Sequence, residues 1–179
     1  MRTLFAVLTF LGFLQASSVA AEDGPLVIEL FTSQGCSSCP PADAMMHDLA
    51  KRDDVIALAL HVDYWDYIGW KDIFGRSENT ARQHAYARAA NATTVYTPQM
   101  VINGTDHVIG SRPLQVMNAI EAHSDRGNPV AVTLTRAGDQ VQIKATTSVS
   151  GEFVVQLVRF TPEQTVAISR GENAGHTYS

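Results

Sequence analysis

Apolar runs and helical patterns alternate over the first two thirds of the chain. Leu26–Phe31 and Val55–Val62 are largely apolar and have the length of buried strands. Between them, apolar side chains recur at helical spacing from Ala42 to Leu49, which predicts a helix that ends at about Lys51. Two such strands joined by a helix form a βαβ unit with parallel strands.

The next stretch predicts a second helix, a hairpin and a third helix. Glu78–Ala90 is rich in alanine and has helical character. Gln99–Ile102 and Asp106–Ile109 then flank Asn103-Gly104, and Asn-Gly between two short apolar runs strongly favours a hairpin. Apolar residues at helical spacing after Ser111 predict a helix to about His123.

The last third of the chain has a period of two, which is typical of strands. Turn-forming residues at Ser124–Pro129 mark the change. The predicted strands are Val130–Leu134, Val141–Ala145, Phe153–Phe160 and Thr165–Ser169. They form an antiparallel β unit that ends on polar, glycine-containing sequence with no closing strand. The sequence does not decide whether the chain is a C-terminally truncated fragment.

Residues 1–21 have the pattern of a cleaved signal peptide. Arg2 gives a positive start, Leu4–Leu14 is apolar, and Ser18–Ala21 offers small residues for cleavage. The alternative is an uncleaved membrane anchor, but the apolar run is too short to span a bilayer well. We expect a secreted or periplasmic bacterial protein with no membrane span after cleavage.

Charge excludes one class of partner. The chain has 13 basic and 18 acidic residues, so its net charge is −5, and loss of Arg2 would make it more negative. Nucleic acid is therefore not an expected partner, because its phosphates need a basic surface. The arginines at 76, 82 and 88 predict a solvated helix face.

The two cysteines of the chain, Cys36 and Cys39, are separated by two serines. They follow the first predicted strand and begin the first predicted helix. A Cys-x-x-Cys pair at such a junction is typical of a reversible dithiol/disulfide. An oxidising compartment permits a disulfide between them.

The order of elements from Leu26 to His123 resembles the thioredoxin fold. The cysteine pair, the Thr97-Pro98 step before a strand and the Asn103-Gly104 hairpin carry this resemblance. It implies an α/β domain with a central mixed sheet flanked by helices. It also implies that Pro98 is cis and packs against the cysteine pair, whereas an isolated proline of this kind is usually trans.

A more specific resemblance lies in the residues around the cysteines. The stretch Glu29–Ala42, with His61–Trp65 and the β-rich C-terminal part, is similar to a secreted bacterial family catalogued as domain of unknown function 1223. That family is thioredoxin-like by fold and has no assigned substrate. The resulting division is a thioredoxin-like domain at 22–124, with a helical insertion at 63–96, and a β appendage at 125–179.

The resemblance implies a role for each cysteine. Cys36 is the expected attacking thiolate, stabilised by the helix dipole and by free amides at the helix start. Cys39 resolves the mixed disulfide with the substrate. Glu29 is costly inside an apolar strand unless it has a role or a partner. The resemblance suggests that it accepts the proton of Cys39, and the alternatives are a basic partner or exposure to water.

Other interpretations of the cysteines stay open. A structural disulfide closing so short a loop would contribute only ~2 kcal/mol. A zinc site needs four ligands, and the candidate histidines at 47, 61, 84 and 107 lack paired spacing. A copper-handling protein could combine Cys36, Cys39 and a histidine. The redox interpretation needs no cofactor.

An aromatic loop is the candidate substrate surface. Tyr64 and Trp65, followed by two further aromatic residues, come directly after the second predicted strand. With Thr97 they could receive a peptide, or they could pack the inserted helix onto the domain. His61 lies at the same end of the sheet, where open α/β sheets bind ligands, although a histidine in such a position is more often structural.

The sequence thus predicts an exported thiol–disulfide oxidoreductase-like protein that acts on protein or small-molecule thiols and disulfides. The competing hypothesis is a non-catalytic thioredoxin-fold binding module. The serine pair between Cys36 and Cys39 indicates no redox direction, and the sequence indicates neither an electron partner nor an oligomeric state.

Overall fold

Four strands form the central sheet of the protein. The computed structural model describes residues 24–124, 126 and 129–178, so the predicted signal peptide lies outside the described residues. The strands are β1 (Leu26–Thr32), β2 (Val55–His61), β3 (Gln99–Ile102) and β4 (Asp106–Ile109). Their order is β2-β1-β3-β4, with β1 and β2 parallel and the other neighbours antiparallel. The predicted parallel pair and hairpin are confirmed.

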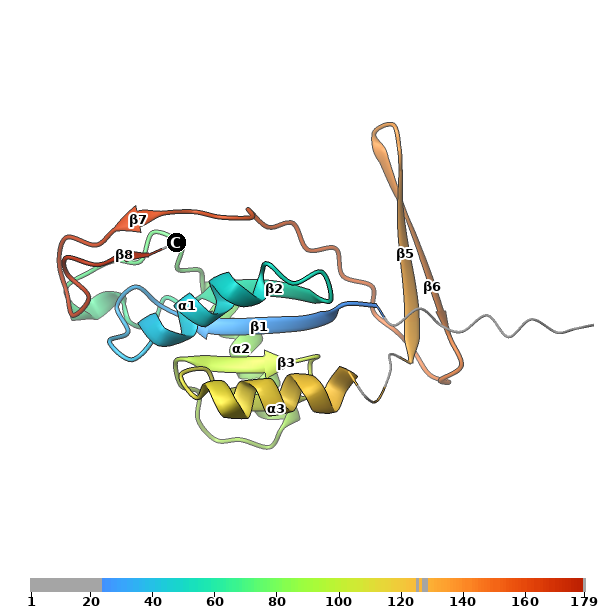
Figure 1. Ribbon diagram of the computed structural model, residues 1–179, viewed down its shortest axis with the longest axis horizontal. Helices are drawn as coiled ribbons and strands as arrows, with labels where there is room; N and C mark the ends of the chain where they lie inside the picture. The colour runs from blue at the N-terminus through green and yellow to red at the C-terminus, as the bar shows by residue number, and fades with distance from the viewer. Residues whose placement is uncertain (1–23, 125, 127–128, 179) are drawn as a thin grey trace, which may run out of the picture.

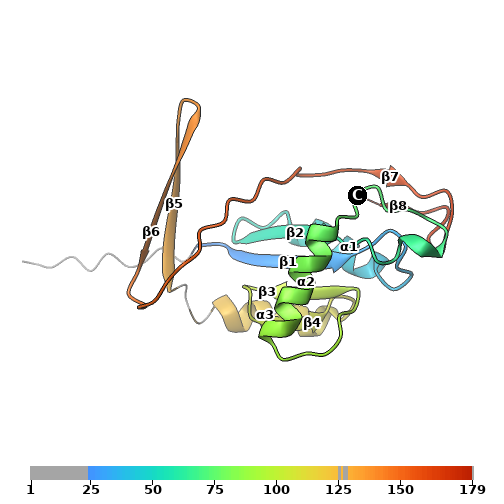
Figure 2. The ribbon, with the colours of Figure 1, turned by 180° about the vertical axis from the view of Figure 1, so that it is seen from behind.

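Three helices cover the two faces of this sheet. On one face lie α1 (Pro40–Leu49) and α3 (Pro113–Ser124), and α2 (Ser77–Ala89) lies on the other (Figures 1 and 2). A short 3-10 helix, Asp66–Ile68, precedes α2. The three α-helices agree with the predicted ranges to within two residues, whereas the 3-10 helix lies in a segment that was predicted as a loop.

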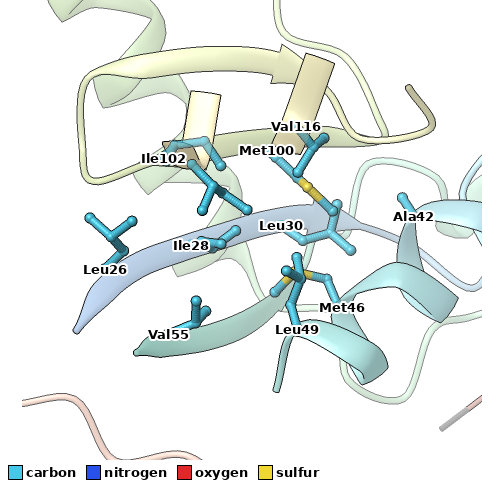
Figure 3. Close-up of a cluster of buried hydrophobic side chains, with 11 residues drawn as sticks. Leu26, Ile28, Leu30, Ala42, Met46, Leu49, Val55, Met100, Ile102 and Val116 are labelled. Carbon is cyan, nitrogen blue, oxygen red and sulfur yellow. The ribbon is translucent and has the colours of Figure 1, made fainter. Parts of the chain in front are cut away.

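The strand period places alternate residues of β1 in two separate clusters. Ile28 and Leu30 pack with Met100 and with the apolar faces of α1 and α3 (Figure 3). Phe31 points to the opposite face of the sheet, the face covered by α2, where it packs with Val101. Because both faces of β1 are buried, the strand is nearly apolar throughout. The result is the predicted thioredoxin-like fold, with a central mixed sheet between helices.

The C-terminal part differs from the expectation in two places. A long hairpin of β5 (Val130–Ala137) and β6 (Gln140–Thr147) projects from the sheet (Figure 1). The predicted strand Phe153–Phe160 is not a strand, and its side chains are exposed. A strand needs a neighbour for its backbone groups, and none of the described strands pairs with this segment.

The chain then returns to the central domain. β7 (Val166–Ala167) pairs antiparallel with β8 (Thr177–Tyr178), so the expectation of no closing strand is wrong. The turn between them carries the buried residues Ile168 and Asn173. Figure 1 shows this turn beside the end of β1 and the start of α1. The end of the described chain therefore lies against the segment that holds the cysteines.

Candidate functional site

A disulfide joins Cys36 and Cys39 in the segment between β1 and α1 (Ser33–Cys39, hereafter the cysteine loop). The Cys36 N–H donates to the carbonyl of Ser33, and the Cys39 N–H donates to the carbonyl of Cys36. Cys36 is 3% exposed and Cys39 is fully buried. The two cysteines thus form a compact bridged turn, and Cys36 is the less buried of the two.

The peptide bond between Thr97 and Pro98 is cis, as the resemblance implied. The Ser38 hydroxyl donates to the Thr97 carbonyl at 3.4 Å and lies 3.5 Å from the Cys36 sulfur. Ser38 therefore links the cysteine loop to the cis step.

Gly110 makes room for Pro98. Its N–H donates to the Pro98 carbonyl at 2.9 Å. A Cβ at Gly110 would lie 3.2 Å from the Cβ of Pro98 and 3.0 Å from that of Ala42. A larger residue at this position would push Pro98 or Ala42 away by a few tenths of an ångström, and glycine avoids this.

The first turn of α1 lacks the free amides that the sequence led us to expect. Pro40 and Pro41 carry no N–H, and the N–H groups of Ala42 and Asp43 donate to the Cys39 carbonyl. That expectation was therefore wrong for these four residues. The helix dipole and the Ser38 hydroxyl are the features left to stabilise negative charge on Cys36.

The residues of the aromatic loop have two different sets of contacts: some lie beside Thr97 and Pro98, and others pack against the inserted helix α2. Trp65 Nε1 donates to Thr97 Oγ1 at 2.8 Å, so two predicted substrate-binding residues contact each other next to Pro98. The Tyr64 hydroxyl donates to Gln83 Oε1 on α2 at 3.1 Å. Tyr64 thus fastens α2 to the domain, while Tyr67 is 79% exposed beside the ring of Trp65.

Asp72 and His61 support the cysteine loop from one side. Asp72 Oδ2 accepts from the Gln34 N–H at 2.8 Å and lies 2.7 Å from His61 Nδ1. Burial raises the pKa of Asp72, but its contacts with His61 and with two backbone N–H groups outweigh this effect and hold the pKa below its usual value. His61 therefore has a buried carboxylate partner that its sequence context did not indicate.

Asp43 is a second carboxyl group close to the cysteines, one helical turn after Cys39. The Thr32 hydroxyl donates to Asp43 Oδ2 at 3.0 Å. Burial raises the pKa of Asp43 to about 7, against the lowering effects of His61 and of the Thr32 hydrogen bond. The sequence analysis did not single out Asp43. Its spacing of four residues from Cys39, which puts both on one helix face, was the available clue.

Asn173 reaches the cysteine loop from the far end of the chain. Its Nδ2 donates to the carbonyl of Gln34 at 2.8 Å and to that of Cys36 at 2.9 Å. The residue is 4% exposed. The sequence analysis missed Asn173, because no local pattern connects it with residues 137 positions earlier.

Glu29 lies on the α2 face of β1 and is 4% exposed. Its carboxylate accepts from Arg82 Nε at 2.7 Å, from Arg82 Nη2 at 3.1 Å and from the hydroxyl of Tyr86. Arg82 was expected on a solvated face, and this ion pair corrects that expectation. A basic partner was one of the alternatives for Glu29, and its role in proton transfer stays a prediction.

Two further findings concern the described part of the chain. Within residues 24–124, 126 and 129–178, no group of three or more histidine, cysteine, aspartate or glutamate side chains is placed to hold a metal ion. None of the helices described there combines the length and the apolar character needed to cross a membrane.

Comparison with known proteins adds a family and a structural relative. Residues 27–179 match the family model described as "Protein of unknown function (DUF1223)". The X-ray structure of protein AGR_C_4864 from Agrobacterium tumefaciens shares 45% sequence identity with the chain, at a TM-score of 0.63. The match covers 69% of this chain and 57% of that one, so the chain spans little more than half of that protein's length. The curated proteins gave no match.

The family match includes the cysteine loop, the cis step and the C-terminal turn that carries Asn173. The chain therefore belongs to the DUF1223 family of proteins of unknown function.

Proposed function

We propose that this protein is an exported thiol–disulfide oxidoreductase that uses Cys36 and Cys39 as its redox pair. One observation carries the proposal: the disulfide at the start of α1 lies beside the Thr97–Pro98 backbone, and the Ser38 hydroxyl bridges the two. This arrangement places a short cysteine pair at a helix start next to a second backbone segment that a substrate peptide could meet.

The reaction is an exchange of disulfide bonds. In the reducing direction, the Cys36 thiolate attacks one sulfur of a substrate disulfide and releases the other sulfur as a thiolate. The Cys39 thiolate then attacks the Cys36 sulfur, which releases the second substrate thiolate and leaves the Cys36–Cys39 disulfide. The oxidising direction is the reverse, with substrate thiols as the electron donors. Neither direction needs a metal or an organic cofactor.

Exposure supports this assignment of roles. Cys36 retains a small exposed surface, whereas Cys39 has none, and the intervening Ser37 and Ser38 are exposed. A partner sulfur can therefore approach from the Cys36 side. Trp65 and the exposed ring of Tyr67 lie on the loop that contacts Thr97, where a peptide carrying that sulfur would meet them.

The deciding experiment is the reduction potential of the Cys36–Cys39 bond in the protein lacking residues 1–21, measured by thiol alkylation across redox buffers. A value between about −120 and −270 mV is expected for a working oxidoreductase. A value below about −300 mV would identify a structural disulfide and would overturn the proposal.

A second experiment tests exchange with real partners. Cys39→Ser should trap mixed disulfides at Cys36 in cells, because the resolving thiol is missing. Cys36→Ser is the matched control and should trap none. If the two variants gave the same pattern, Cys36 would not be the attacking residue. If binding of partners survived replacement of both cysteines, the binding-module interpretation would be favoured.

A further inference from the structure

We propose that Asn173 is a positioning residue of this redox site, which acts through the backbone of the cysteine loop and favours closure of the disulfide. The inference rests on the proposed function and adds to it a residue from the C-terminal part of the chain. Asn173 does not react itself. Its effect is on how often the Cys36 and Cys39 sulfurs meet in the reduced protein.

The two shortest contacts of the Asn173 amide are with carbonyl groups of the cysteine loop, and a third, at 3.3 Å, is with the Tyr178 hydroxyl. One amide nitrogen, Nδ2, donates to the carbonyls of Gln34 and Cys36 at 2.8 and 2.9 Å. The Cys36 carbonyl also accepts from the Cys39 N–H at 3.1 Å, within the turn that the disulfide closes. Asn173 therefore holds two peptide groups of the loop. One carries the Cys36 carbonyl and lies between the two cysteines, and the other carries the Gln34 carbonyl and lies before them.

The position of Asn173 is itself well fixed. The Gly175 N–H donates to the Ile168 carbonyl at 2.8 Å, and the Ile168 N–H donates to the His176 carbonyl at 2.9 Å. Ile168 is 2% exposed, so it anchors this turn in the interior. Gly171 has a φ of 81°, and a Cβ there would lie 2.9 Å from the Cβ of Trp70. The turn is thus packed closely against the aromatic loop and presents the amide in one place.

Two further residues hold the same loop at Gln34. Asp72 accepts from the Gln34 N–H at 2.8 Å, and Trp70 Nε1 donates to the Gln34 side chain at 2.7 Å. Gln34 is fully buried. The cysteine loop is therefore held at Gln34 by Asp72 and Trp70, and at Gln34 and Cys36 by Asn173.

This restraint matters most after reduction. When the sulfur–sulfur bond is broken, a loop without restraint can turn Cys36 away from Cys39, and closure must then overcome the entropy of ordering the loop. A loop already held in the closed geometry has a higher effective concentration of one thiol at the other. Asn173 should therefore stabilise the disulfide relative to the dithiol.

The size of the effect follows from the net contribution of a buried hydrogen bond. Loss of one such bond changes an equilibrium constant by about fivefold to tenfold. For the two-electron disulfide couple this corresponds to a potential about 20–30 mV less negative. The expected sign is a less stable disulfide in the variant, because a looser loop closes less readily.

The test compares Asn173→Ala with Glu172→Gln in the protein lacking residues 1–21. Glu172 is the exposed neighbour in the same turn, so its variant controls for changes in the turn that do not touch the cysteine loop. Each protein is equilibrated with reduced and oxidised glutathione, and the fraction of disulfide gives the equilibrium constant. Circular dichroism shows that each protein is folded at the temperature used. We expect a fivefold to tenfold decrease for Asn173→Ala and no change for Glu172→Gln.

The outcomes separate this inference from the proposed function. A wild-type potential in the range of structural disulfides overturns the proposed function, whatever Asn173 does. A working wild-type potential with an equal constant in Asn173→Ala overturns the positioning role alone. If Asn173→Ala does not fold, Asn173→Ser replaces it, because its short hydroxyl cannot span both carbonyls, and the same decrease is expected. If neither variant folds, Asn173 is a structural residue and the proposal is wrong.

Discussion

The hydroxyl of Thr32 donates a 3.0 Å hydrogen bond to the carboxyl group of Asp43, which joins the last residue of β1 to the first turn of α1. Both residues border the cysteine loop, one on each side. Burial raises the pKa of Asp43 to about 7, although the Thr32 hydrogen bond lowers it, so the carboxyl group changes its charge within the pH range of ordinary assays.

Stability should therefore depend on pH through Asp43. Because its pKa is higher in the folded protein than the 3.8 of the unfolded chain, the folded state binds the proton more tightly. Its contribution to stability is fully present below about pH 4 and is lost as the pH rises to about 7. The slope is at most about 1.4 kcal/mol per pH unit. Urea unfolding of wild type and Asp43→Asn across this range measures it.

We expect Asp43→Asn to lose less stability than wild type between pH 4 and pH 7. Asp53→Asn, at an exposed turn, should follow wild type. An identical pH dependence in wild type and Asp43→Asn would contradict the raised pKa.

Glu29→Gln should destabilise the fold. The change removes the charge that pairs with Arg82 and leaves the guanidinium with a weaker acceptor. Because Arg82 is 38% exposed, water replaces part of the lost contact. We therefore expect a loss of about 1.5 kcal/mol, the lower end of the range for hydrogen bonds to charged groups. Urea unfolding gives this value, and Glu78→Gln on the exposed side of α2 is the control.

The same variant tests the role that the sequence suggested for Glu29. If Glu29 accepts the proton of Cys39, the mixed disulfide should be resolved more slowly in Glu29→Gln. This effect would come in addition to the loss of stability. An unchanged exchange rate in the folded variant would exclude that role.

Ser38→Ala should raise the pKa of the Cys36 thiol. In the reduced protein the Ser38 hydroxyl, 3.5 Å from the sulfur, can turn its single O–H from the Thr97 carbonyl to the thiolate, and the first helical turn offers few amides in its place. A bond of this kind corresponds to about one pKa unit. The pH dependence of alkylation by iodoacetamide measures the shift. The neighbouring Ser37→Ala should show none, and an equal shift in both would count against a specific contact.

Trp65→Phe should affect large substrates more than small ones. The variant keeps an aromatic ring but loses the donor to Thr97 Oγ1, so the aromatic loop is less firmly attached to the cis step. We expect exchange with a peptide disulfide to slow by about fivefold, the effect of one hydrogen bond, and exchange with glutathione to change little. Tyr67→Phe, at an exposed ring, is the control. Equal slowing with both substrates would mean that Trp65 does not contact the peptide.

Local chemistry was sufficient for most of the fold. The apolar run of β1, the helical spacing of α1 and the Asn103-Gly104 turn depend on neighbours in sequence, and these predictions are confirmed. The disulfide that the cysteine spacing permits is also present, while its redox activity stays a prediction. The cis Pro98 was predictable only because a family resemblance supplied the context.

What could not be predicted depends on contacts between distant residues. Asp72 and Asn173 are single polar residues without a pattern, and only the fold brings them to the backbone of Gln34. The prediction of a strand at Phe153–Phe160 was wrong for a related reason. Alternation shows which face of a strand could be buried, but it does not show whether another strand is present to pair with it.

The position of Asn173 has a consequence for the order of events during synthesis. The cysteine loop is made 137 residues before Asn173, so a chain that emerges amino end first presents Cys36 and Cys39 to its surroundings before this side chain exists. An oxidant that reaches the loop at this stage meets a segment that Asn173 does not yet restrain. If the proposed role of Asn173 is right, the bond can form before that residue is present, and its final stability is set only after Asn173 has been added.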